Sequence, residues 1–330
     1  MKYLPFLLLP VLALLSLFWG SADIAATDVW RALTTGGADG SAASFIVLHV
    51  RLPQMLTALL AGSALAAAGL VMQTVFANPL ADPSLLGVNA GAGLGAAVAM
   101  LFLGGSLAAG SLSLSGYVLT VVAACVGAFG VIALLVLFSA LFRGNLQLLV
   151  AGVMVSFAAS SVIAILSYFA TAQGLQGYVL WGMGDFSAVT TERLPAFAAA
   201  ILLCLAFLWL QTKPLNALLL GNDYAANLGI RVRPTRTGLL LATGLLSAVV
   251  TALCGPVAFI GLAAPHIARF LHHTADHRRL LPLTFAWGAD IALLAVLLTH
   301  LPGGIVLPIN AITPLLGVPV VFVLLFKRSV

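Results

Sequence analysis

The chain has very little charge. Only 7% of its 330 residues are Asp, Glu, Lys or Arg, whereas 62% are hydrophobic. Soluble domains carry about 25% charged residues, so this composition excludes a soluble globular protein. The mean hydropathy of +1.17 is typical of an integral membrane protein. Lipid is therefore the first partner that the sequence predicts.

Cysteine and nucleotide-binding motifs are also scarce. Cys125, Cys204 and Cys254 lie inside apolar segments and have no Cys-x-x-Cys spacing. They are expected to be small buried apolar residues, which excludes a disulfide framework and gives no metal site. The glycine-rich run from Gly87 to Gly95 lacks the strand and acidic residue of a dinucleotide site, and the chain has no Gly-x-x-x-x-Gly-Lys-Ser/Thr loop. We expect no cofactor and no ATP bound by this chain.

What the sequence does contain is a series of apolar segments near the length of about 20 residues that crosses a bilayer. They predict an all-α integral membrane protein whose residues 1–330 form a single transmembrane domain. The first segment follows Lys2 as a secretory signal would, but its length favours a retained helix. The ten segments lie near residues 4–20, 55–77, 85–103, 117–142, 146–170, 195–211, 237–254, 256–272, 282–300 and 311–326.

The positive charges orient these segments. With a cytoplasmic N-terminus, eleven of the 14 Lys and Arg residues fall inside and only Arg31, Arg51 and Arg193 outside. This bias follows the positive-inside rule and predicts that both termini are cytoplasmic. The net charge of +5 then reflects topology and anionic lipid, and does not indicate nucleic acid. The residues predicted inside are Lys2, Arg143, Lys213, Arg231, Arg233, Arg236, Arg269, Arg278, Arg279, Lys327 and Arg328.

A polar elbow, Asn78–Pro83, separates the second and third segments, and we call it the gate elbow. Pro79 and Pro83 break any continuous helix there. Backbone freed at membrane depth must be buried by protein or wetted by a cavity. Just before it, Met72 and Gln73 are candidates to line a pore, although an amide in an apolar helix also serves as a bond between helices.

Several runs along the chain resemble the permease subunit of ABC importers for iron-siderophores, haem and cobalamin. The resemblance implies the type II ABC importer permease fold, with about ten transmembrane helices. It also implies a multi-pass protein of the bacterial inner (cytoplasmic) membrane. The matching runs are RLPQ from Arg51, GSALAAAG from Gly62, NPLADP from Asn78, GPVAFIGLAAPHIARF from Gly255, DHRRLLP from Asp276, LPINAIT from Leu307 and LGVP from Leu316.

The same resemblance implies the partners. The permease would be a homodimer, joined by two cytoplasmic ABC ATPase subunits that bind the ATP. A periplasmic binding protein would deliver an iron chelate, haem or cobalamin. The resemblance places the docking contact at Arg51, and Arg31 and Arg193 are further candidates because Gln54 stands where the family usually has a second arginine. An arginine that anchors a helix end at the lipid head groups is the alternative.

By resemblance, Asn78 and Leu80 match the cytoplasmic gate, and Asn145 falls near a second gate contact with a looser match. A polar residue beside a leucine suits a constriction that closes by packing and opens to water. The alternative is that Asn78 only caps the turn before Pro79.

Residues 213–236 are too polar to span the membrane and resemble the segment that seats in the ATPase; we call them the coupling segment. Gly221 and Gly229 divide it into two amphipathic pieces, and Asn222 or Asp223 is expected to cap the second piece. A surface helix lying on the membrane is the alternative. The candidate contacts with the ATPase are Leu215, Asn216, Leu219, Gly221, Asp223, Leu228 and Gly229.

Asp290 is the carboxylate placed deepest within a span, which makes it a candidate functional residue. It either makes a structural contact between helices or is the coupling carboxylate of an ion-driven secondary transporter, which is the alternative function. That alternative has few membrane charges with which to build a proton or sodium relay.

Two groups of histidines remain. His272, His273 and His277 lie beside Asp276 with a spacing that a metal could use, but a solvated basic loop next to the ATPase is the expected structure. His49 and His300 fall near the predicted outer vestibule, where haem ligation is conceivable although nothing in their spacing demands it.

Overall fold

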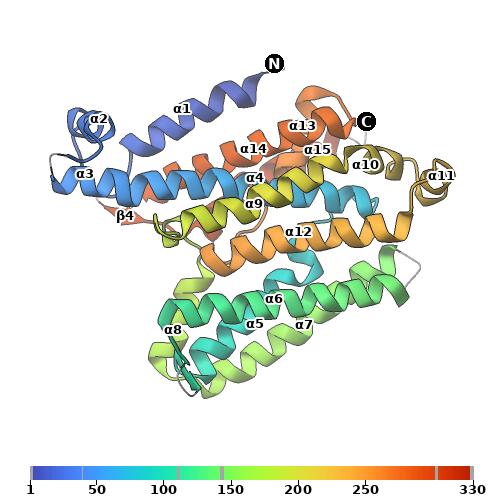
Figure 1. The fold of residues 1–330 in the computed structure, drawn as a ribbon, viewed down its shortest axis with the longest axis horizontal. Helices are drawn as coiled ribbons and strands as arrows, with labels where there is room; N and C mark the ends of the chain where they lie inside the picture. Colours follow the sequence, from blue (N-terminus) through green and yellow to red (C-terminus); the bar gives the residue numbers. More distant parts are fainter. Residues whose placement is uncertain (1–2, 39, 110–111, 142–144, 302–303, 328–330) are drawn as a thin grey trace.

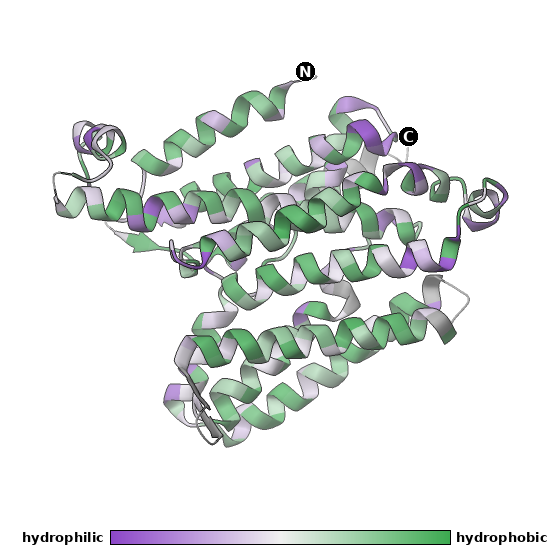
Figure 2. Ribbon diagram, in the orientation of Figure 1, coloured by the Kyte–Doolittle hydropathy of each residue, from purple (hydrophilic) through white to green (hydrophobic). Residues whose placement is uncertain are grey.

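The computed structural model describes residues 3–38, 40–109, 112–141, 145–301 and 304–327. Within them the chain is almost entirely helical, as predicted (Figure 1). The long helices lie roughly along one direction, with α10 and α11 at one end and α2, α3 and α8 at the other. The apolar residues run along the helices, and hydrophilic residues gather toward their ends (Figure 2).

The first half of the chain holds helices α1 (Leu4–Phe18), α2 (Ala26–Thr35), α3 (Ala42–Ile46), α4 (Leu52–Val75), α5 (Val88–Ala97), α6 (Gly116–Leu141) and α7 (Asn145–Phe169). Short π-helices η1 (Val47–Arg51) and η3 (Val98–Phe102) join or extend them, η2 (Pro83–Leu86) is a 3-10 turn, and β1 (Ser106–Ala109) pairs antiparallel with β2 (Leu112–Ser115).

The second half holds α8 (Ala172–Gly182), the 3-10 turn η4 (Phe186–Ala188), α9 (Leu194–Leu210), α10 (Thr212–Leu218), α11 (Asn222–Asn227), α12 (Val232–Cys254), α13 (Ile260–His272), α14 (His277–Thr299) and α15 (Ile309–Lys327). A second small hairpin pairs β3 (His300–Leu301) with β4 (Ile305–Val306).

Helix α4 is the centre of the packing. It contacts α9, α12, α13 and α14, while α5, α6, α7 and α8 form a separate group that meets the rest mainly through α12 (Figure 1), and also through a hydrogen bond from Asn310 of α15 to the Gly182 carbonyl of α8. Nearly every residue of α4 is buried, which explains why it is apolar on all faces.

Five described helical stretches are long and apolar enough to cross a membrane, and α9 with α10 makes a sixth if their 57° bend is one broken span. Three shorter apolar helices, Leu4–Phe18, Val88–Phe102 and Ile309–Val320, together with α13, correspond in order to the remaining predicted segments. The five long stretches are Ala42–Val75, Gly116–Ser139, Gln147–Phe169, Val232–Cys254 and His277–Thr299.

Glycines permit the close approach that the small-residue runs predict. A Cβ at Gly62 of α4 would overlap the Gly288 carbonyl of α14, and one at Gly69 would overlap the Gly261 carbonyl of α13. Gly95 of α5 packs in the same way against Ala123 of α6. The glycine-rich run from Gly87 to Gly95 therefore packs helices, as expected.

Some boundaries differ from the prediction. Residues 20–50, expected as a polar loop, contain α2 and α3, and the helix that becomes α4 already begins at Ala42. The last residues of the coupling segment are the first turn of α12, which begins at Val232. Short polar helices and hairpins lack a long periodic pattern, so they are hard to predict from sequence.

Candidate gate elbow and coupling segment

The gate elbow lies shortly after α4, which ends at Val75. Ala77 has a positive φ of 48°, and the Asn78 backbone N–H donates to the Gln73 carbonyl at 3.1 Å. The Asn78 side-chain carbonyl then accepts the backbone N–H of Leu80 at 2.9 Å. This turn leaves the Leu80 side chain 42% exposed. Asn78 does form the turn, and in doing so it presents Leu80 at the surface.

The second half of the gate elbow is fixed by Asp82. Its Oδ1 accepts the backbone N–H of Ser84 at 2.8 Å and so caps η2. The carboxylate is buried against Gly261, in the first turn of α13, where a larger residue would collide with it. Burial raises the pKa of Asp82, and the hydrogen bonds from Ser84 oppose that rise.

Helix α13 holds the gate elbow from the side. The His266 Nε2 lies 2.9 Å from the Pro79 carbonyl, and Arg269 Nη1 donates to Gln73 Oε1 at 2.5 Å. Residues far apart in the sequence thus hold both the last turn of α4 and the gate elbow that follows it. Gln73 bonds between helices, which was one of its two predicted roles.

The expected pore-lining role of Met72 and Gln73 is corrected by their burial. Their side chains are only 1% and 4% exposed within the single chain. Met72 Sδ accepts the Thr243 hydroxyl at 3.8 Å. Both residues therefore face neighbouring helices. The prediction failed because the apolar residues around them do not indicate which side of the helix faces water. Asn145 begins α7, but its side chain and the preceding residues 142–144 lie outside the described part of the chain.

The coupling segment forms α10 and α11. Gly221, with φ of 103°, and Gly229, with φ of 82°, end the two pieces in a backbone conformation that glycine favours. The N-cap of α11 is Gly221 itself and no side chain caps it, so the expected cap by Asn222 or Asp223 is wrong. Both residues lie inside the first turn, Asn222 one position and Asp223 two positions past the N-cap.

The predicted ATPase contacts divide into two groups. Leu215 is fully buried, and Asn216 is half-buried and hydrogen-bonded within the chain, so both hold α10 in place. Gly221, Asp223 and Gly229 are exposed. The apolar side chains exposed here are Leu219 at 45%, Leu220 at 64%, Tyr224 at 50% and Leu228 at 59%, and we call them the coupling surface.

Leu220 and Tyr224 of the coupling surface escaped the sequence analysis. Leu220 directly precedes Gly221 and Tyr224 follows it three residues later, and an apolar residue near a turn glycine in a non-spanning segment was the available signal. Four exposed apolar side chains on α11 and the turns after α10 and α11 favour contact with another protein.

Asn216 ties α10 to the start of α14. Its Nδ2 donates to Asp276 Oδ1 at 2.6 Å, and its Oδ1 accepts from both the backbone N–H and the Nδ1 of His277 at 2.8 Å. The hydrogen bond from Asn216 lowers the pKa of Asp276. His277 is fully buried, so the expected solvated loop is wrong for this residue. No group of three metal-ligating side chains occurs among the described residues.

At the opposite end, Arg51 is buried. Only 4% of it is exposed, and its guanidinium donates to the carbonyls of Leu17, Phe18 and Ala22 at 2.9, 3.0 and 2.5 Å. The expectation that Arg51 faces a docking partner is corrected: it joins the end of α1 to the start of α4. The three carbonyls lie some 30 residues upstream, and nothing local to RLPQ indicates them.

The other two docking candidates remain nearer the surface. The Arg31 side chain is 61% exposed and lies 3.6 Å from Asp28. Arg193 is half-buried, with its guanidinium 4.2 Å from the centre of the Tyr117 ring.

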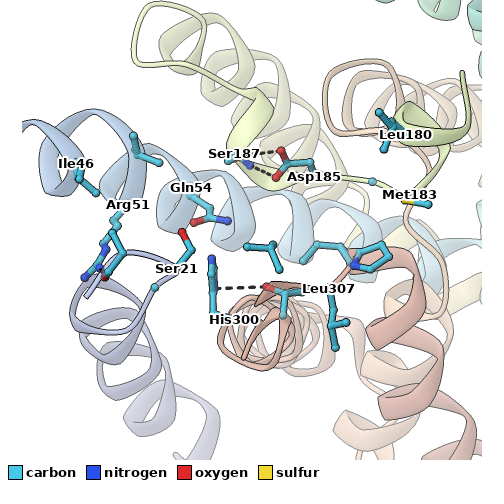
Figure 3. Close-up of a pocket in the computed structure, with 18 residues that line it drawn as sticks. Ser21, Ile46, Arg51, Gln54, Leu180, Met183, Asp185, Ser187, His300 and Leu307 are labelled. Atoms are coloured by element: carbon cyan, nitrogen blue, oxygen red, sulfur yellow. Dashed lines mark hydrogen bonds between the residues drawn. The ribbon is translucent and has the colours of Figure 1, made fainter. Parts of the chain in front are cut away.

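Near Arg51 the chain forms a cavity of about 400 Å³ (Figure 3). Gln54, Asp185 and His300 line it together with apolar residues such as Leu307. His300 is 9% exposed, and its Nδ1 lies 2.8 Å from the Val296 carbonyl. His49 does not line the cavity and stacks on Phe45 with ring centres 4.8 Å apart.

Two polar residues sit inside the helix bundle. Asp290 is 3% exposed, and neither carboxyl oxygen has a hydrogen-bond partner in the described residues. Asn89, which the sequence analysis missed, accepts hydrogen bonds at its Oδ1 from Ser247 at 3.0 Å and Thr251 at 2.9 Å. It joins α5 to α12, and its place inside an apolar segment was the available signal.

The geometry agrees with known proteins over the whole chain. A solved metal-chelate type ABC transporter in an inward-facing conformation is 31% identical, with a TM-score of 0.85 over 99% of this chain and 98% of that one. Vitamin B12 import system permease proteins BtuC are similar in sequence. Those of Salmonella paratyphi A and Escherichia coli O157:H7 are each 37% identical, over 96% and 98% of this chain and 94% and 95% of their own lengths.

The match to the FecCD transport family covers residues 8–327 and therefore includes the gate elbow, the coupling segment and the helices between them. The runs that first suggested the resemblance all lie within that range. This chain belongs to the FecCD transport family.

Proposed function

We propose that this chain is the transmembrane permease subunit of an ATP-driven, binding-protein-dependent importer. The observation that carries the proposal is the full-length similarity to the vitamin B12 import permeases, 37% identity over 96% of the chain. The subunit would lie in the bacterial inner membrane with both termini in the cytoplasm. It would form a homodimer, bind two ABC ATPases on the cytoplasmic side and receive substrate from a periplasmic binding protein.

The coupling surface supports the ATPase partner. Leu219, Leu220, Tyr224 and Leu228 are exposed on α11 and the turns that follow α10 and α11, beyond the end of the long helices (Figure 1). Exposed apolar patches mark protein contact sites, and tyrosine is enriched among the residues that anchor a protein interface. The ATPases would grip this surface and move it when they close on ATP. The chain's part is mechanical, and ATP hydrolysis would belong to the partner subunit.

The gate elbow supports alternating access. It follows α4 at the same end of the molecule as the coupling segment and presents Leu80 at the surface. In a homodimer, Asn78 and Leu80 would meet their copies across the translocation path, with Asn145 as a further contact. Such a constriction closes by packing and opens to water. On the outer face, Arg31 and Arg193 would contact the acidic side chains of the binding protein, and Arg51 would position the helix ends that carry them.

We propose cobalamin or an iron chelate, such as a ferric siderophore or haem, as the substrate. The test is uptake of radiolabelled cobalamin, ferric siderophore and haem by cells that carry or lack this chain. Loss of uptake for one of the three, restored by the chain on a plasmid, is the expected result and names the substrate. Unchanged uptake of all three would contradict the proposal.

An ion-driven secondary transporter is the second candidate, and Asp290 is the observation that favours it. A buried carboxylate without a hydrogen-bond partner in the described residues is a candidate proton or ion site. This candidate predicts that uptake follows an ion gradient and is abolished by Asp290→Asn. The importer proposal predicts that uptake follows ATP.

A further inference from the structure

We propose that His277 is a positioning residue that links the coupling segment to the gate elbow, through Asn216 on one side and Thr74 on the other. This inference rests on the proposed function, because it says how motion of α10 would reach the gate. It is carried by three hydrogen bonds among buried or half-buried residues on three different helices: two from His277 to Asn216 of α10, and one between His277 of α14 and Thr74 of α4.

The first link is Asn216, and its orientation is unambiguous. Its Oδ1 accepts from the backbone N–H of His277 and lies 2.8 Å from the His277 Nδ1, while its Nδ2 donates to Asp276 at 2.6 Å. A flipped amide would place its NH₂ group against a backbone donor and its oxygen against a carboxylate. Because Oδ1 is an acceptor, the His277 Nδ1 must carry a proton and donate it. The first turn of α14 therefore moves with α10.

The second link is Thr74. The His277 Nε2 lies 2.9 Å from the Thr74 hydroxyl, which also lies 3.0 Å from the Leu70 carbonyl one turn back in α4. With Nδ1 protonated, a neutral imidazole has a lone pair at Nε2, so the single Thr74 hydroxyl proton is shared between Nε2 and the Leu70 carbonyl. His277 thus has one ring nitrogen for the coupling segment and the other for α4. An imidazole does this in one rigid plane, with its two nitrogens on opposite sides.

Thr74 is next to the part of α4 that holds the gate. The preceding residue, Gln73, accepts the Asn78 backbone N–H at 3.1 Å and the Arg269 side chain at 2.5 Å. The last turn of α4, the gate elbow and α13 are therefore one connected body at this end. A shift of Thr74 would be passed to Asn78 without any flexible segment between them.

Burial makes the link stiff. His277 is 0% exposed and Thr74 4% exposed, so water cannot replace either hydrogen bond. Breaking a hydrogen bond in this buried setting leaves an unpaired polar group, which costs free energy. The link between α10 and α4 is maintained for that reason while the helices tilt.

The test measures coupling in the whole importer. The complex is purified through a tag on this chain with its co-purifying ATPase, reconstituted with its binding protein, and assayed for substrate transported per ATP hydrolysed. Three variants are compared: Thr74→Val, His277→Asn and the double variant. Valine keeps the shape of threonine without the hydroxyl, and asparagine keeps a donor at the Nδ1 position but does not reach Thr74. Each single change is expected to lower the ratio of substrate transported to ATP hydrolysed about 3- to 10-fold. The double variant is expected to lower this ratio no further than either single variant.

A matched control separates this effect from general loss of packing. Thr57→Val lies on the same helix, is fully buried, and removes a hydroxyl that has no partner in the described residues. It should leave the ratio unchanged. A second readout is labelling of Leu80→Cys, whose accessibility should respond to ATP in the control and not in His277→Asn. If His277→Asn fails to assemble, His277→Gln, which reaches Thr74 but loses the Nδ1 bond, replaces it with the same expectation.

Two outcomes would contradict the inference. Wild-type ratios in all three variants would overturn it while leaving the proposed function intact. So would a double variant whose loss of coupling equals the sum of the two single losses, because the effects of independent sites are additive. A wild-type complex that hydrolyses ATP without moving any substrate would overturn the proposed function, and the inference would fall with it.

Discussion

Arg269 of α13 donates a 2.5 Å hydrogen bond to Gln73 of α4, the residue whose carbonyl also holds Asn78 at the start of the gate elbow. The pair ties the last turn of α4 to α13. A hydrogen bond to a charged group contributes about 1.5–3 kcal/mol, so this pair has a measurable effect on stability.

Gln73→Leu should lower the free energy of unfolding by roughly 1.5–3 kcal/mol, because it leaves the Arg269 guanidinium short of an acceptor. Thermal unfolding of the purified chain in detergent measures the loss. Gln54→Leu is the matched control, since Gln54 is half-buried and lines the cavity at the other end of α4. Equal stability of Gln73→Leu and Gln54→Leu would contradict the structural role of the pair.

Gly62→Ala should be destabilising by about 1–3 kcal/mol, the usual cost of overpacking. The added methyl group would overlap the Gly288 carbonyl of α14. The matched change is Gly130→Ala, in a helix and with open space around the new methyl group. It should be neutral or stabilise by up to about 1 kcal/mol. The same thermal unfolding assay compares the two variants. An unchanged stability of Gly62→Ala would show that α4 and α14 are farther apart than the structure places them.

Arg51→Gln should destabilise the chain by about 3 kcal/mol, because three carbonyls lose a charged donor. Arg31→Gln should leave stability unchanged, since its side chain is exposed, and should instead weaken binding of the binding protein at low ionic strength. Thermal unfolding and a binding titration at two salt concentrations separate these effects. A stable Arg51→Gln that binds weakly would restore Arg51 as a docking residue.

Leu228→Asp should prevent the ATPase from co-purifying with this chain while leaving its thermal unfolding unchanged. Leu228 is 59% exposed directly after α11, and an interface residue whose loss costs about 2 kcal/mol lowers the affinity about 30-fold. Asn227→Asp places the same charge one residue away without removing an apolar side chain. If the two variants lose the ATPase equally, charge and not apolar contact explains the loss.

Asp276 should make stability depend on acid pH. Its pKa is lower in the folded chain than in the unfolded one, because Asn216 donates a hydrogen bond to the ionised form. The ionised carboxylate therefore stabilises the fold above an unfolded pKa of about 3.9, and that contribution is lost as the pH falls further. Unfolding temperatures measured from pH 6 to pH 3 should fall less steeply in Asp276→Asn. Parallel curves for the two proteins would contradict this account.

The sequence predicted those features that depend on neighbours along the chain. Pro79 and Pro83 break a helix wherever they stand, and Gly62 and Gly69 allow close approach to any helix that lies beside them. A segment too polar to span predicted Leu219 and Leu228 of the coupling surface in the same way, but not Leu220 and Tyr224.

The sequence could not show which distant groups would meet. Arg51 finds its acceptors at the end of α1, and Gln73 finds Arg269 on α13, 196 residues later. In an apolar chain every helix face is a candidate for burial, so a wet face cannot be told from a protein-facing one without the fold. The burial of Met72 and the link through His277 are decided by such tertiary contacts.

The central claim is that this chain moves its substrate with ATP. The direct measurement is the initial rate of uptake into proteoliposomes that contain the purified complex, with the labelled substrate and its binding protein outside and the ATPases facing the lumen. Uptake should require ATP in the lumen, survive a protonophore and sodium ionophore, and persist in Asp290→Asn. Uptake that proceeds without ATP, stops with the ionophores and is lost in Asp290→Asn would contradict the account and assign the chain to the ion-driven transporters.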